Sequence, residues 1–194
     1  MPVNTSKTAY RINVEKPVIA FMTSDDSTGC EYEAPKSIGK AMQVTYAPKI
    51  ASGTLYGDGG IADETSQLTG ADFTLGNTKI PIEIVARMYG HNYINGIMVE
   101  KKGDEPIPFA FGYEVPQTNG EREFIWLLKC KAQPMSEDVK QQESNVNYST
   151  DSVKFSVMPR EFDNAIRFKA DTANEDFTAK DTIMSAVPTT VPAE

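Results

Sequence analysis

The chain has 194 residues, which is enough for one domain with a substantial hydrophobic core. Hydrophobic residues make up 40% and charged residues 24%, a composition that excludes a disordered chain and a membrane-spanning one. The 27 acidic residues outnumber the 19 basic ones, and the formal charge of −8 disfavours a protein that grips nucleic acid, because that binding needs Lys and Arg to replace counterions on phosphate.

The start of the chain predicts an irregular arm followed by strands. Residues 1–16 are polar, and the first five lack a basic region followed by an apolar one, so we expect no secretory signal. Residues 17–22 form a short apolar run that ends in the loop-forming stretch 23–29. Apolar and polar residues then alternate over 41–46, which predicts a half-buried strand that we expect Pro48 to close.

A hairpin is predicted between residues 52 and 67. Ser52–Tyr56 reads as extended, and Asp58-Gly59 supplies a turn, because glycine accepts the positive φ that tight turns need. The return arm, Ile61–Gln67, is polar and acidic, so we expect the hairpin to project from the body of the protein. Alternation over 71–75 predicts another strand.

One helix is predicted at about residues 79–90. Its apolar residues recur at helical spacing and form a stripe that should pack on a sheet: Ile80, Ile84, Val85, Met88 and Tyr89. Thr78 is a candidate N-terminal cap, and Pro81 falls in the first turn, where its missing N–H costs little. Gly90 stands where a left-handed C-terminal cap would lie.

The sequence offers little catalytic chemistry. The opposite helix face carries Glu83 and Arg87 at the i,i+4 spacing of an ion pair, and the only histidine, His91, is interpreted as a surface or capping residue. Cys30 and Cys130 with one histidine are too few for the about four ligands of a zinc site. A single disulfide remains open, although two buried free thiols are favoured. We therefore expect no catalytic, cofactor or metal site, and no enzyme.

A long hairpin is predicted over residues 107–132. Alternate apolar residues from Ile107 to Val115 share one face, and Gln117–Gly120 supplies an Asn-Gly turn. On the second strand we expect one face made of Phe124, Trp126, Leu128, Cys130 and Ala132. Because Ile125 and Leu127 make the strand apolar on both sides, we place Trp126 in the core or at a subunit interface.

The rest of the chain predicts two strands and a polar end. Alternation over 153–157 and 166–170 follows a charged connection at 136–149. Residues 173–194 read as an extended C-terminal arm. The sum is a single α+β, mainly β domain spanning residues 1–194. It comprises an N-terminal arm at 1–16, a β-sandwich core at 17–172 with one flanking helix and a projecting hairpin, and the C-terminal arm.

Several of these segments, in this order, resemble one protein family. The segments are Ser52–Asp58, the helix end Tyr89-Gly90, Gly96–Glu100, Pro108–Glu114, Phe124–Ala132 and Thr150–Pro159. Together they resemble the major tail proteins, or tail tube proteins, of long-tailed, non-contractile bacteriophages of Gram-positive hosts, over roughly residues 40–170.

This resemblance implies a structural virion protein with a tail-tube-type β-sandwich. Such subunits form hexameric rings that stack into a hollow tube, with strands of six subunits joined around the lumen. The tube would surround the tape-measure protein during assembly in the host cytoplasm, meet tail terminator and baseplate proteins at its ends, and conduct the genome into the host without a membrane partner. An acidic lumen would let DNA pass without specific binding.

Contact between rings is assigned to the hairpin tip and the two termini. The tip residues are Tyr56, Gly57, Asp58, Gly59, Gly60 and Ile61. The alternative function is a non-catalytic β-sandwich binding module, carbohydrate-binding or immunoglobulin-like, on a virion or cell surface. Oligomeric state separates the two, because a module stays monomeric whereas a tube protein yields rings or polymers.

Overall fold

The computed structural model describes residues 9–134, 150–174 and 176–190 of the chain. The fold is α+β and mainly β, as predicted, with one helix and eleven strands among these residues. The elements are β1 (Glu15–Asp26), β2 (Gly29–Tyr32), β3 (Lys36–Ser37), β4 (Ala41–Gly57), β5 (Gly60–Asn77), α1 (Ile82–Tyr89), β6 (Asn92–Ile94), β7 (Ile97–Val99), β8 (Phe109–Pro116), β9 (Arg122–Ala132), β10 (Asp151–Met158) and β11 (Arg167–Asp171).

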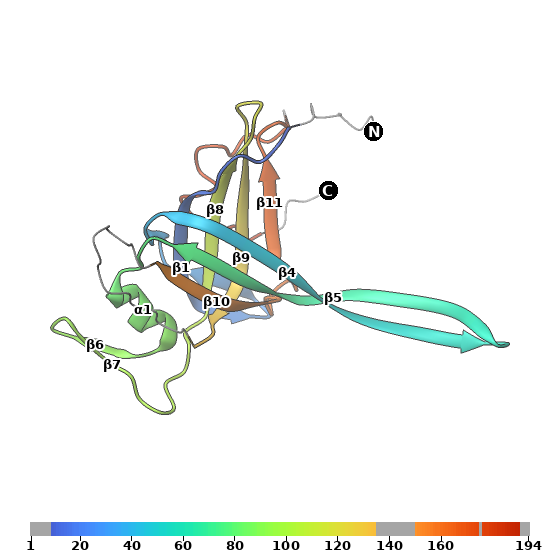
Figure 1. Ribbon diagram of the computed structural model, residues 1–194, viewed down its shortest axis with the longest axis horizontal. Helices are drawn as coiled ribbons and strands as arrows, with labels where there is room; N and C mark the ends of the chain where they lie inside the picture. Colours follow the sequence, from blue (N-terminus) through green and yellow to red (C-terminus); the bar gives the residue numbers. More distant parts are fainter. Residues whose placement is uncertain (1–8, 135–149, 175, 191–194) are drawn as a thin grey trace, which may run out of the picture.

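One large antiparallel sheet organises the described residues. Its strands follow the order β2-β1-β8-β9-β10-β5-β4, with β11 beside β9 and β3 beside β1, while β6 and β7 form a separate small hairpin. The sheet folds over on itself, so that β4, β5 and β10 cross in front of β1, β8 and β9 (Figure 1). The predicted strands at 71–75, 107–115, 124–132, 153–157 and 166–170 all lie in this sheet.

Aromatic side chains fill the space between the two layers of the sheet. The ring centroid of Phe73 on β5 lies 5.1 Å from that of Phe155 on β10 and 5.3 Å from that of Phe111 on β8. All three rings are buried, and burial of each stabilises the fold by about 2–3 kcal/mol. Hydrophobic contact across the layers therefore holds the sandwich together.

Strand β9 contains a bulge that reverses which of its side chains face the main core. Phe109 on β8 pairs with Cys130, but Phe111 pairs with Leu127, so one extra residue is inserted in β9 between these pairs. Trp126 and Leu128 consequently face the outer side of the layer, whereas Cys130 and Ala132 face the main core. The prediction that Phe124, Trp126, Leu128, Cys130 and Ala132 share one face is wrong, because the bulge reverses the alternation.

Helix α1 starts later than predicted, at Ile82, and ends as predicted. Gly90 adopts the left-handed conformation, with φ of 72°. Thr78 does not cap the helix, which has no side-chain cap; instead the carboxylate of Asp151 accepts the N–H of Ile80, at 2.7 Å. Within the described part of the chain, no helix has the length and apolar character that crossing a membrane requires.

The predicted ion pair between Glu83 and Arg87 does not form. The Arg87 guanidinium instead donates to the carboxylate of Glu33, at 2.7 Å for one of its two bonds, and lies 4.2 Å above the ring of Phe21. The bidentate ion pair with Glu33 is held in place by tertiary structure, and an aromatic ring lies beneath the guanidinium. It is therefore more stable than a solvent-exposed ion pair on the helix surface.

Two strands are longer than predicted. β1 runs through the expected loop as far as Asp26 and turns directly into β2. β4 runs through Pro48, which pairs with Ala71 on β5. Proline is tolerated there because β4 lies at the end of the sheet, where one side of the strand needs no N–H donor.

The described parts of both predicted arms lie on the sheet. The Ile12 N–H donates to the Pro116 carbonyl, at 3.0 Å, so this N-terminal stretch continues along β8. Residues 176–190 cover the outer side of the layer that contains β9, where Ile183 and Val187 pack with Trp126. The expectation of an extended C-terminal arm is therefore wrong for these residues. The charged connection at 136–149 lies outside the described residues.

Candidate functional site

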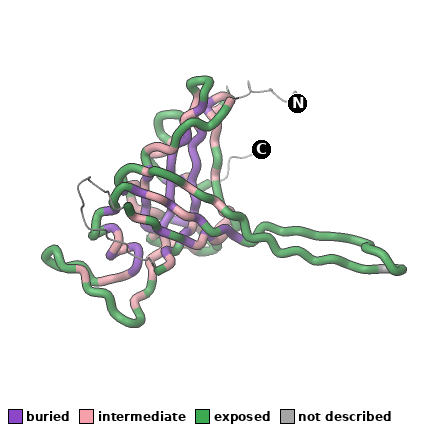
Figure 2. Tube along the Cα trace, viewed as in Figure 1, coloured by how far each residue is buried: buried purple, intermediate pink, exposed green. Residues whose placement is uncertain are grey.

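The most prominent surface of the molecule is the distal part of the β4–β5 hairpin, residues 47–69, called here the ribbon. It leaves the body of the protein as two strands with no third element beside them (Figure 1). Every residue of the ribbon with an assigned burial is exposed, from 47–56 on the outward strand and from 58–69 on the return strand (Figure 2). From Pro48 to Gly57 it extends about 30 Å, at about 3.3 Å per residue.

The tip of the ribbon is a tight two-residue turn. Gly57 pairs with Gly60, and the two residues between them, Asp58 and Gly59, have φ of 48° and 82°. Positive φ at both central residues defines the turn that matches the twist of paired strands, and Asp-Gly is a favoured sequence for it. The six predicted tip residues are thus brought together, with Tyr56 paired to Ile61 beside the turn.

Large apolar side chains occur along the ribbon although nothing covers them. Tyr56 is 72% exposed and Ile61 63% exposed, and Ile50 and Leu68 form a second exposed pair nearer the body. Alternation along β4 places Ile50 and Tyr56 on the same face, so both apolar pairs lie on one side of the ribbon. A two-stranded ribbon is marginally stable in water by itself, and apolar pairs of this kind favour a partner.

The outer edge of β4 adds an unpaired backbone to this surface. Among the described strands, β4 pairs only with β5, along all of Ala41–Gly57. A long, exposed edge strand presents N–H and C=O groups that another chain can pair with, a hazard that proteins usually block. The sequence predicts the hairpin but not the unbroken edge of β4, because Pro48 predicts a strand end.

The other predicted site residues lie in the body of the protein. Ile80, Ile84 and Met88 are buried in the main core, and Val85 packs against it. Trp126 is completely buried and donates from Nε1 to the Ile183 carbonyl, at 2.8 Å. Among the described residues it therefore lies in the core, beneath the C-terminal segment, and away from the ribbon. Both cysteines are buried and free, as favoured from the sequence.

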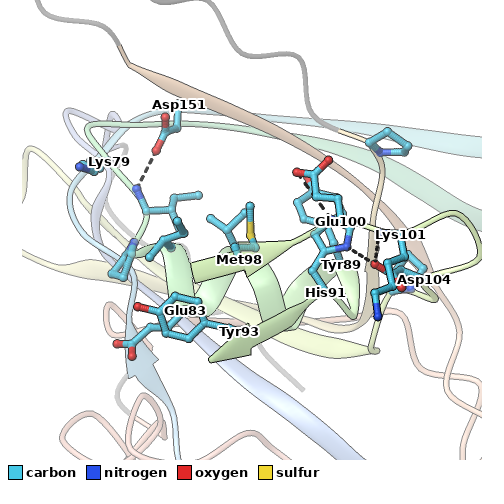
Figure 3. A pocket seen from close by; sticks show the side chains of 16 residues that line it. Lys79, Glu83, Tyr89, His91, Tyr93, Met98, Glu100, Lys101, Asp104 and Asp151 are labelled. Atoms are coloured by element: carbon cyan, nitrogen blue, oxygen red, sulfur yellow. Dashed lines mark hydrogen bonds and ion pairs between the residues drawn. The ribbon is translucent and has the colours of Figure 1, made fainter. Parts of the chain in front are cut away.

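A groove of about 1020 Å³ lies beside α1, between the helix and the β6–β7 hairpin (Figure 3). His91 stands at one end of it, with Nδ1 2.7 Å from the carboxylate of Asp104 and its ring stacked on Tyr89. Burial, together with the charge of Glu100, raises the pKa of Tyr89 to about 12, so its hydroxyl stays protonated and donates to the Gln133 carbonyl.

The groove holds an acid–histidine pair without a Ser, Thr or Cys among its described lining residues. The Asp104 carboxylate accepts the Lys101 N–H at 2.8 Å, and this bond, with that from His91, lowers the pKa of Asp104. Within the described chain, no group of three His, Cys, Asp or Glu residues is placed to hold a metal ion. Through its contacts with Asp104 and Tyr89, His91 holds the loop that contains Asp104 against the C-terminal end of α1.

Comparison with known proteins adds no family to these observations. No protein-family model matches the sequence, and a search of curated proteins finds no match. The fold and the surfaces of the chain are therefore the basis on which its function is inferred.

Proposed function

We propose that this chain is a structural subunit of a bacteriophage tail tube. Its copies form hexameric rings that stack into a hollow tube in the virion, and this tube conducts the genome into the host. During assembly in the host cytoplasm the tube surrounds the tape-measure protein, and tail terminator and baseplate proteins meet its ends.

The observation that carries the proposal is the ribbon. It projects about 30 Å from the sandwich, is exposed on both faces and carries the apolar pairs Ile50–Leu68 and Tyr56–Ile61. Burial of each of these side chains in a contact between copies stabilises the assembly by about 1–2 kcal/mol. The open edge of β4 adds backbone hydrogen bonds to a contact of this kind. These features support a protein whose surface is completed by further copies.

Electron microscopy of the purified chain at increasing concentration tests the proposal. We expect hollow tubes or rings of even width. A chain that stays monomeric, both alone and when produced together with a set of tail assembly proteins, overturns the proposal. A monomer that binds a carbohydrate favours the alternative binding module.

A matched pair of variants tests the part assigned to the ribbon. Tyr56→Ser with Ile61→Ser, or deletion of residues 57–60, should leave the fold intact and impair tube formation. The control is Ile94→Ser with Ile97→Ser, since these side chains are 58% and 65% exposed and are also paired across a hairpin. Normal tubes from the ribbon variants would show that the assignment of ring contacts to the tip is wrong, although the tube function would stand.

A further inference from the structure

The two ends of the β4–β5 hairpin differ in charge. Residues 50–69, which form its outer part, contain Asp58, Asp63 and Glu64 but no Lys or Arg. All three carboxylates are exposed, and none takes part in an ion pair with another described residue. Asp58 lies in the turn next to the exposed apolar pair Tyr56–Ile61, and Asp63 and Glu64 follow on the return strand, paired with Leu55 and Thr54. The outer end is therefore an apolar contact with an acidic rim.

The inner end of the same hairpin carries lysines, which we call the lysine corner: Lys36, Lys40 and Lys79. The Thr78 N–H donates to the Lys40 carbonyl, at 3.0 Å, which places the segment before β4 against the segment after β5. Lys36 lies four residues before Lys40 on that first segment, in β3. All three lysines are exposed, and no described carboxylate pairs with them.

The lysine corner also offers apolar surface. Met42 at the start of β4 is 58% exposed, and Ile82 at the start of α1 is 46% exposed. Of the nearby carboxylates, that of Glu33 pairs with Arg87, that of Asp151 accepts the Ile80 N–H, and that of Glu83, next to Ile82, is exposed. The three lysines outnumber Asp151 and Glu83. The lysine corner thus complements the tip in two ways: its lysines match the acidic residues of the tip, and its exposed apolar side chains match the apolar pair there. Tip and corner lie at opposite ends of the hairpin, with α1 beside the corner (Figure 1).

We propose that the tip of the ribbon of one copy docks on the lysine corner of the next copy. The inference depends on the proposed tube function and specifies the surface that receives the ribbon. Because the two surfaces are different, the contact is head-to-tail; where the rotation between successive copies does not close it into a ring, it continues from copy to copy along the tube. The distance between corner and tip sets an upper limit on the repeat between docked copies, because the 17 residues of β4 span about 53 Å from first to last at about 3.3 Å per step.

Charge reversal on each surface, alone and together, tests the contact. The tip variant is Asp63→Lys with Glu64→Lys; Asp58 is left in place because its φ of 48° suits Asp better than Lys. The corner variant is Lys40→Glu with Lys79→Glu. Each variant should raise the concentration needed for tube formation about tenfold, because like charges then face each other across the contact. Combining both variants in one chain should bring that concentration back to within about threefold of wild type.

The matched control is Lys131→Glu with Lys154→Glu, two exposed lysines on β9 and β10 that no described carboxylate pairs with. It changes the net charge as much as the corner variant does. When it is combined with the tip variant, the concentration needed for tube formation should not return toward the wild-type value. If wild type forms tubes and the combined variant assembles no better than the corner variant, the docking of tip on corner is overturned and the tube function stands. If wild type never assembles, both are overturned.

Discussion

Replacement of Gly112 by alanine should destabilise the sandwich through the one tryptophan of the chain. A Cβ at this position on β8 would lie 2.9 Å from three ring atoms of Trp126 on β9. Ordinary carbon contacts are about 3.5–4.0 Å, so the indole or the strand must move by about 0.6–1 Å. The indole is fully buried, so it has no solvent-exposed side toward which it can turn.

The cost of this substitution follows from two contacts. Overpacking of a filled core costs about 1–3 kcal/mol. Movement of the indole also stretches the hydrogen bond from Trp126 Nε1 to the Ile183 carbonyl, which is 2.8 Å long and contributes about 0.5–1.5 kcal/mol. We expect a loss of about 2–4 kcal/mol in the free energy of unfolding. For a chain of this size that lowers the melting temperature by about 5–15 °C.

Urea and thermal unfolding of the unassembled chain measure this loss, with tryptophan fluorescence as the probe. Gly53→Ala is the control, because a Cβ there meets nothing within 4 Å, and it should leave stability unchanged or slightly higher. The double variant Gly112→Ala with Trp126→Phe, followed by circular dichroism, should cost less than the sum of its parts, since a phenyl ring leaves room for the methyl group. A Gly112→Ala chain as stable as wild type would refute the packing argument.

Two further predictions concern buried charge. Arg160→Met should cost about 3–5 kcal/mol, because it leaves the Asp163 carboxylate without its buried partner and frees the Pro188 carbonyl; limited proteolysis should then cut residues 176–190 sooner than in wild type. Burial alone would raise the pKa of Asp25, but bonds from the Lys129 ammonium and the N–H groups of residues 161–162 outweigh it and lower the pKa. This carboxylate therefore stabilises the fold above its ordinary pKa of 3.8, and that contribution is lost as pH falls through the lower folded value. In urea titrations Asp25→Asn should be less stable than wild type at pH 7, and the difference should shrink below pH 3.8; a constant difference from pH 7 to pH 2 would contradict this.

Local periodicity predicted the strands that form the centre of the sheet. Alternation over 107–115 and 153–157 matches β8 and β10, because strands that border a filled core must present apolar side chains at every second position. The helix stripe and Gly90 predicted α1 for the same reason, with an error of three residues at its start. These features depend on neighbours in sequence, so the sequence contains the information needed to find them.

Features that depend on distant neighbours were predicted less well. The bulge in β9 follows from its pairing with β8, and alternation within β9 alone cannot reveal it. Arg87 pairs with Glu33 rather than with Glu83, because the fold brings a better acceptor to it. Pro48 ends a strand only where its missing N–H is needed, and the edge position of β4 is a property of the sheet.

The candidate assembly surface also has one part that the local sequence predicts and one part that depends on the tertiary structure. Asp58-Gly59 determines the turn at the tip of the ribbon by itself, because the conformations these two residues tolerate suit a tight hairpin. The lysine corner has no sequence signature, since Lys40 and Lys79 lie far apart in the chain. Only the pairing of β4 with β5 returns the chain to its starting point and places these lysines together, opposite the acidic tip. The sequence alone determined the shape of the tip, and the tertiary structure decided where charge of the opposite sign gathers.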